Sequence, residues 1–60
     1  MKLLKLEDVM DRTSLGRSTM YNLLDEGRFP KPVKVGRLNA WPETEIDEWI
    51  QGRITERDAA

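Results

Sequence analysis

Residues 15–33, LGRSTMYNLLDEGRFPKPV, contain a helix together with the signals that end it. Met20, Leu23 and Leu24 follow the i, i+3, i+4 spacing of one helix face, which predicts a helix over about 17–26. The glycine that follows is favoured after a helix because it adopts the left-handed conformation without strain. Two prolines shortly afterwards prevent the helix from continuing. The stretch therefore predicts a short helix with a single apolar face.

A second short helix is predicted just upstream. The apolar residues within 6–12 repeat the same spacing. Leu3 and Leu4 precede it as a brief extended segment. Residues 13–16 then form a tight turn in which we expect Leu15 to be buried. Two short helices separated by about four residues, one of them a glycine, match the spacing of a helix-turn-helix.

A small hairpin is predicted downstream. Residues 33–35 and 39–41 have strand character, with Gly36, Arg37 and Leu38 between them. The prolines before residue 33 keep the first strand at an edge or confine it to a few residues. We expect Phe29 to anchor the base of this hairpin.

A third helix is predicted to begin at Pro42, since the first helical position does not need a free N–H. The acids that follow suit the positive end of a helix dipole. Gly52 weakens the pattern beyond residue 51, so we expect residues 55–60 to fray and the ordered part to span about 3–53. The core-facing stripe is expected at Ile46, Trp49 and Ile50, with Ile54 as a further candidate.

Length and composition narrow the functional class. A chain of 60 residues forms at most one domain, residues 1–60, and its core is small. The chain has no Cys and no His, which excludes a Ser-His-Asp triad, a cysteine nucleophile and the usual zinc sites. We therefore expect no enzyme, no metal and no cofactor. We also expect no membrane partner, because the apolar runs are too short to span a bilayer. The N-terminus is too short and too soon charged for a signal peptide, and the lack of Cys fits a reducing bacterial cytoplasm.

Charge is balanced overall and segregated along the chain. The net charge is −1. Residues 12–38 hold six Lys and Arg against two acids, a net +4, whereas residues 39–60 hold two Arg against six acids, a net −4. This pattern indicates one surface that faces an anion and another that does not, although an uneven solvated surface would give the same counts.

The helix over 17–26 offers polar side chains of the types that contact DNA. The second helix of a helix-turn-helix enters the major groove and points its N-terminal residues at base edges. Arg donates two bonds to guanine, Asn pairs with adenine, and hydroxyl groups hold phosphate oxygens. The alternative is that Ser18 or Thr19 caps the helix and Tyr21 covers the edge of the core. The candidate contacts on this helix are Arg17, Ser18, Thr19, Tyr21 and Asn22.

The hairpin supplies further candidates at Lys31, Lys34, Arg37 and Asn39. A hairpin beside a recognition helix reaches phosphates or the adjacent minor groove, where Arg is favoured. Lysines that guard an exposed strand against aggregation are the alternative. We expect Trp41 and Trp49 to be core residues rather than platforms for single-stranded bases. The acids at 43, 45, 47 and 48 are expected to be solvated or to meet a basic partner.

The order of these motifs resembles the AlpA family of prophage regulators. The resemblance rests on residues 13–21, on GRFPKPV at 27–33, on Trp41 and on EIDEWI at 45–50. It implies a MerR-like winged helix-turn-helix, mainly α, with the hairpin as the wing. Two positions depart from the family pattern. Gly16 replaces a capping residue, which would shift capping to Ser18, and Asn22 stands where a basic residue is common.

The resemblance implies sequence-specific binding of double-stranded DNA by a regulator of an integrase or excision locus. Arg17, Tyr21 and Asn22 would read bases, and Arg37 would lie at the minor groove. We expect self-association or side-by-side binding on repeated sites, because one such module buries little surface on DNA. One alternative is an architectural excisionase that bends DNA and recruits an integrase. Another is a protein-interaction module, an anti-repressor or antitoxin, that uses the acidic third helix.

Overall fold

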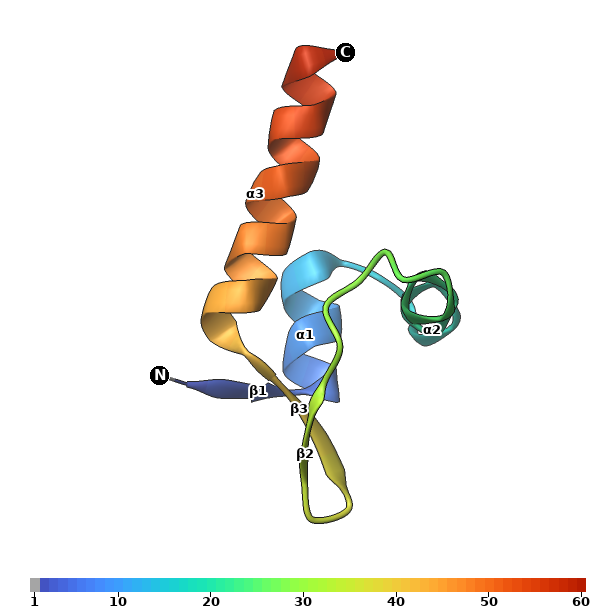
Figure 1. Ribbon diagram of the computed structural model, residues 1–60, viewed down its shortest axis with the longest axis vertical. Coiled ribbons are helices and arrows are strands. Elements are labelled where there is room, and N and C mark those ends of the chain that lie inside the picture. The colour runs from blue at the N-terminus through green and yellow to red at the C-terminus, as the bar shows by residue number, and fades with distance from the viewer. Residues whose placement is uncertain (1) are drawn as a thin grey trace.

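A computed structural model describes residues 2–60, which form three helices and a three-stranded antiparallel sheet. The N-terminal strand, the two short helices, the hairpin and the long helix follow one another along the chain (Figure 1). This arrangement is consistent with a winged helix-like fold in which the hairpin is the wing. The elements are β1 (Leu3–Lys5), α1 (Leu6–Thr13), α2 (Arg17–Asp25), β2 (Val33–Val35), β3 (Leu38–Pro42) and α3 (Glu43–Ala59).

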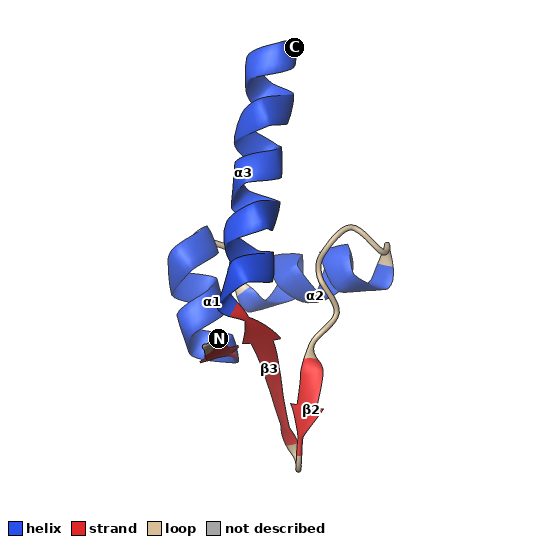
Figure 2. Ribbon diagram, turned by 60° about the vertical axis from the view of Figure 1, so that its left-hand side comes forward, coloured by secondary structure: helices blue, strands red, loops and turns tan. Residues whose placement is uncertain are grey.

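The sheet contains one strand more than the hairpin that the sequence predicts. Its order is β1-β3-β2, so the extended segment at Leu3 and Leu4 is a strand that pairs with β3. The hairpin prediction is confirmed, with a turn shorter than expected because Val35 pairs with Leu38. Gly36 has a positive φ of 62°, which a two-residue hairpin turn requires at its first position. The hairpin extends away from the helices (Figure 2).

The core lies where the inner face of the sheet meets the helices. Leu4, Val9, Met20, Trp41 and Ile46 are almost fully buried, and Leu15 packs against them from the turn between α1 and α2. Both tryptophans belong to this packing, as predicted. Burying these side chains supplies most of the free energy that holds so short a chain folded.

The segment between α2 and the hairpin is held by aromatic side chains. Phe29 is buried, and its ring meets the rings of Trp41 and Trp49 edge-on, with centroids 6.5 and 4.8 Å away. The indole N–H of Trp41 donates to the carbonyl of Pro30 at 2.8 Å, and that of Trp49 donates to the carbonyl of Arg28 at 2.9 Å. These contacts position the hairpin relative to α2, in agreement with the expected role of Phe29 at its base.

Helix α2 ends as its sequence predicts. The N–H of Gly27 donates to the carbonyl of Leu24 at 3.1 Å, and the N–H of Arg28 donates to that of Leu23 at 2.8 Å. This is the Schellman pattern, and it needs the left-handed backbone that Gly27 adopts at φ 72°. The length and direction of α2 are therefore set by its own sequence.

Helix α3 is longer than predicted. The helix continues to Ala59, so the fraying predicted for residues 55–60 does not occur. This last part projects beyond the rest of the molecule (Figure 1). Strong helix formers and the ion pair of Arg53 with Glu56, at 3.1 Å, outweigh the single Gly52. Because this part leaves the body, Ile54 is 37% exposed and does not extend the core stripe. None of the helices in residues 2–60 has the length and apolar character needed to cross a membrane.

Candidate nucleic-acid interface

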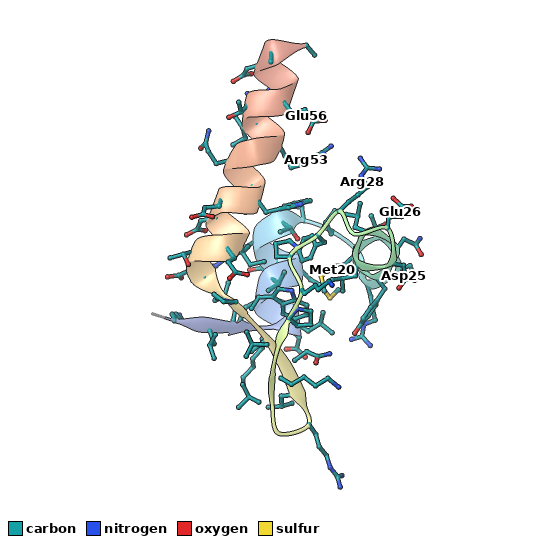
Figure 3. All side chains as sticks on the ribbon, viewed as in Figure 1. Met20, Asp25, Glu26, Arg28, Arg53 and Glu56 are labelled. Carbon is teal, nitrogen blue, oxygen red and sulfur yellow. The ribbon has the colours of Figure 1, made fainter. Side chains whose placement is uncertain are left out.

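Helix α2 has a buried side and a polar side. Met20 points into the core while Asp25 points outward (Figure 3), and Leu23 and Leu24 are half-buried. The five candidate contact residues of this helix are all exposed, because the apolar spacing that buries Met20 leaves the remaining positions outside. They are Arg17, Ser18, Thr19, Tyr21 and Asn22.

The start of α2 differs from the expected capping arrangement. Gly16 is the N-cap residue, and it carries no side chain with which to cap. Ser18 is the second residue inside the helix, so the expected shift of capping to Ser18 is wrong. The first hydrogen bond of the helix runs from the N–H of Met20 to the carbonyl of Gly16 at 3.0 Å. The amides of residues 17–19 therefore point outward from the positive end of the helix.

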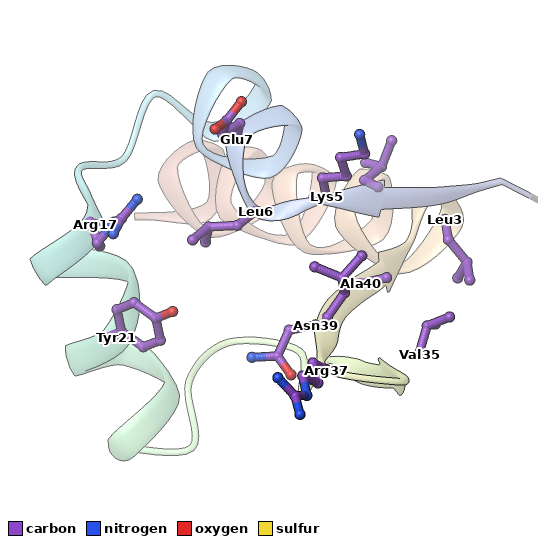
Figure 4. A pocket seen from close by; sticks show the side chains of 12 residues that line it. Leu3, Lys5, Leu6, Glu7, Arg17, Tyr21, Val35, Arg37, Asn39 and Ala40 are labelled. Atoms are coloured by element: carbon purple, nitrogen blue, oxygen red, sulfur yellow. The ribbon is translucent and has the colours of Figure 1, made fainter.

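A hollow of about 490 Å³ separates α2 from the hairpin. Arg17 and Tyr21 lie on the α2 side, and Arg37 and Asn39 face them from the hairpin (Figure 4). Four of the nine candidate residues thus line one concave surface, although they come from two elements. The sequence places them on separate segments, and the aromatic packing at residues 28–30 brings the segments together.

The other five candidates lie outside the hollow. Lys34 pairs with Asn39 in the hairpin, so the two side chains share the inner face of the sheet. Lys31 is exposed just before β2, and the three remaining candidates are exposed on α2. The lysines therefore flank the hollow without lining it.

Two charged residues of the hollow were not among the candidates. Lys5 ends β1 and Glu7 lies in the first turn of α1, and both line the hollow because β1 pairs with β3 beside the hairpin. The sequence signal for a three-residue strand is too short to reveal this pairing. Glu7 adds a negative charge beside the three basic residues of the hollow, which disfavours phosphate there. The lining is completed by aliphatic side chains, Leu3, Leu4, Leu6, Val35, Leu38 and Ala40.

Arg12 does not contribute to the basic surface. Its guanidinium lies 2.7 Å from a carboxylate oxygen of Glu43 and 3.6 Å from one of Asp47, so it joins α1 to α3. The remaining positive charge concentrates elsewhere. Residues 27–42 hold Arg28, Lys31, Lys34 and Arg37 and no acid, and of these Arg28 pairs with Glu26 at 3.4 Å.

Six of the eleven acidic residues lie on α3, and the other five lie on α1 and at the end of α2. Glu45, Asp47 and Glu48 are exposed on α3, and Glu43 is half-buried against Arg12. The exposed side of α2 is therefore polar and the hairpin segment basic, whereas α3 presents an acidic surface. This separation agrees with the charge segregation along the sequence.

An exposed polar helix after a tight turn, next to a basic hairpin, is the arrangement of small helix-turn-helix proteins that bind DNA. The family model described as prophage CP4-57 regulatory protein (AlpA) matches residues 2–54. The chain therefore belongs to the AlpA family of prophage regulatory proteins, as the sequence resemblance predicts.

Two known proteins resemble almost the whole of this chain. The chain is 40% identical over 57 residues to "Uncharacterized protein ORF88" of Enterobacteria phage P4, covering 93% of this chain and 65% of that protein. It is 34% identical over 58 residues to a "Probable excisionase" of Saccharopolyspora erythraea, covering 97% of this chain and 58% of that protein. The chain thus spans roughly three fifths of the length of these relatives.

Proposed function

We propose that this protein binds double-stranded DNA sequence-specifically, as a MerR-like winged helix-turn-helix regulator of an integrase or excision locus. Helix α2 enters the major groove, and the tip of the β2–β3 hairpin meets the adjacent minor groove. The observation that supports this proposal is the hollow lined by Arg17 and Tyr21 on one side and by Arg37 and Asn39 on the other.

The hollow suits the DNA backbone that separates the two grooves. A strand of phosphates that passes between a helix in the major groove and a hairpin in the minor groove crosses the space between those elements. Lys5 supplies a positive charge and Asn39 an amide donor for phosphate oxygens at this place. The outward amides at the start of α2 favour an anion for the same electrostatic reason.

The exposed side chains divide into two roles. Arg17, Tyr21 and Asn22 read base edges, since they project from the first half of α2. Ser18, Thr19, Lys31 and Lys34 hold phosphates, which sets the register on DNA without reading sequence. One module of this size buries only about 600–1,000 Å² on DNA, so we expect copies of the chain to bind cooperatively at repeated sites.

An architectural excisionase is the second candidate function, and the name of the Saccharopolyspora relative favours it. Such a protein bends DNA and recruits an integrase, whereas a plain regulator needs neither property. A DNA-bending assay with and without the integrase separates the two. A protein-interaction module is the third candidate, and it would use the exposed Glu45 and Glu48 of α3.

The decisive experiment is fluorescence anisotropy of the protein on labelled duplexes that tile its own locus, with a scrambled duplex as control. We expect one tile to be preferred at least about tenfold, which is about 1.4 kcal/mol. With about four to six phosphates neutralised, the slope of log K against log salt should be about −4 to −5.

Other results would contradict the proposal. Equal binding to every duplex would exclude sequence-specific reading, and a salt slope near zero would exclude docking on the phosphate backbone. Absence of binding at low salt, together with a protein complex that is lost on charge reversal at Glu45 and Glu48, would favour the interaction module.

A further inference from the structure

The tip of the β2–β3 hairpin carries apolar side chains on the face that points away from the core. Paired residues of antiparallel strands share a face, and successive residues alternate between faces. Val35 pairs with Leu38, whereas Trp41 and its partner Leu4 occupy the buried inner face. We call the opposite side the outer face, and its exposed hydrophobic residues are Leu3, Val33, Val35 and Leu38. All of these except Val33 also border the hollow between the hairpin and α2.

Leu38 stands out on this face. Its exposed fraction is 65%, the largest among the big hydrophobic side chains of residues 2–60, and that of its partner Val35 is 49%. The stability of the fold does not explain why a leucine stands at position 38. Leucine is not one of the residues that strands favour, and a side chain this exposed adds little buried area to the core.

Leu38 lies on a narrow part of the hairpin whose neighbouring sequence is basic. Arg37 precedes it in the chain, and no acid occurs anywhere in residues 27–42. Because β1 pairs only with residues 40–42 of β3, the hairpin beyond Ala40 is a two-stranded ribbon that ends in the turn at Gly36 and Arg37. A thin basic ribbon with an apolar residue beside an arginine matches what minor-groove binding requires.

We infer that Leu38 is an apolar wedge that inserts into a base step of the minor groove while Arg37 lies along the groove. The inference rests on the proposed function and adds a residue that deforms DNA. Proteins that bind the minor groove insert apolar side chains between base pairs, which unstacks one step and kinks the duplex. Pyrimidine–purine steps are the easiest to unstack, so Leu38 also creates a preference for such a step beside the groove-bound Arg37.

Burial of the outer face against a second copy of the chain is less favourable. Four partly exposed aliphatic side chains fall far short of the roughly 800 Å² per partner that a stable protein interface buries. A symmetric contact through this face would also bring two Arg37 side chains together without a neighbouring acid on the hairpin. DNA supplies the negative charge that the tip lacks.

The test uses the full chain on the duplex that the tiling experiment selects, so failure of DNA binding is recognised beforehand and separately. The duplex carries donor and acceptor dyes at its ends to report bending, and 2-aminopurine at successive positions to report unstacking. The variants are Leu38→Ala, Leu38→Phe, which keeps a wedge, and Val33→Ala, a control on the same face outside the hollow. Circular dichroism confirms that each variant is folded.

We expect the wild-type protein to bend the duplex by about 20–90° and to raise 2-aminopurine fluorescence at one step. Leu38→Ala should lose most of the bend and the fluorescence increase, and should bind about tenfold more weakly. Its salt slope should be unchanged, because an apolar side chain releases no counterions. Leu38→Phe should retain both signals, and Val33→Ala should behave as wild type.

Three results would overturn the inference while leaving DNA binding intact. The first is a wild-type complex in which no step is unstacked. The second is a Leu38→Ala protein that bends and unstacks the duplex as the wild type does. The third is a Leu38→Ala defect that appears only when two copies bind a duplex with two sites, which would assign Leu38 to contact between copies.

Discussion

The first turns of helices α2 and α3 carry opposite charges, although neither helix has a side chain that caps it. Gly16 precedes α2 and Pro42 precedes α3. The first turn of α3 holds Glu43 and Glu45, whereas that of α2 holds Arg17 and no acid. Since the N-terminus of a helix is positive, the acids stabilise α3 and the arginine opposes α2.

Under the proposed function, this difference separates a helix that stabilises the fold from a helix that contacts DNA. In α3, the acid at position 43 pairs with Arg12 of α1, and Ile46 is buried in the core. In α2, the positive end remains open and the cation beside it increases the local positive potential. Departures from favourable local sequence are expected at functional sites. The start of α2 is such a departure, and a phosphate would compensate it.

The largest effect is expected from the folding helix. Ile46→Ala removes a fully buried side chain of α3 and should lower the free energy of unfolding by about 2–5 kcal/mol. In so small a domain this loss approaches the total stability. Urea and thermal unfolding followed by circular dichroism measure it, with the exposed Thr44→Ala as control, which should change stability by less than about 0.5 kcal/mol. Similar losses of unfolding free energy in the two variants would show that burial of Ile46 does not stabilise the fold.

Arg17→Ala tests the binding helix. We expect the protein to remain as stable as wild type or slightly more stable, because a cation leaves the positive end of α2. Affinity for the preferred duplex should fall by about 1–3 kcal/mol, and discrimination should relax at one or two base pairs. Anisotropy on the preferred duplex and on its point variants measures both effects.

Lys34→Ala is the matched control for Arg17→Ala, because Lys34 lies on the hairpin outside the hollow and is expected to contact phosphate. It should weaken binding to all sequences alike and make the salt slope shallower by about 1. If Arg17→Ala also weakens every sequence equally, then Arg17 does not read bases.

Periodic patterns made much of this fold predictable. Met20, Leu23 and Leu24 define the buried side of α2, Gly27 defines its end, and the two tryptophans are too large to leave the core of a small domain. Short-range spacing carries these signals. The exposed side of α2 follows from the same spacing, which is why its five candidate residues are found exposed.

Features that depend on contacts between distant segments were not predictable. The strand β1 has only three residues, so no alternation reveals its pairing with β3 or the position of Glu7 in the hollow. The pairing of Arg12 with α3 is likewise tertiary. The persistence of α3 past Gly52 depends on summed helix propensity and on the Arg53 ion pair, which one glycine does not overcome.

An acid introduced at the start of α2 should give this helix the acidic, stabilising first turn that α3 has. Ser18→Glu places a carboxylate near the positive end of α2 and should raise the free energy of unfolding by about 0.3–1 kcal/mol. The same carboxylate repels phosphate, so DNA binding should weaken by about tenfold or more. Glu45→Lys is the mirror change in α3 and should lower stability by a similar amount without weakening DNA binding. A Ser18→Glu protein that is more stable and binds DNA normally would separate the start of α2 from the interface.

The smallest expected effect concerns Glu7, the one acid that lines the hollow among the described residues. Glu7→Gln removes a negative charge that faces the phosphates, so affinity for all duplexes should increase about two- to fivefold, corresponding to roughly 0.5–1 kcal/mol for an exposed charge. Stability should decrease slightly, since Glu7 lies in the first turn of α1. Glu48→Gln changes the net charge equally but lies on α3, so it should leave affinity almost unchanged at 0.15 M salt, where the Debye length is about 8 Å. Equal tightening by both variants would mean that only net charge matters, and the hollow between α2 and the hairpin would then not be the path of the DNA backbone.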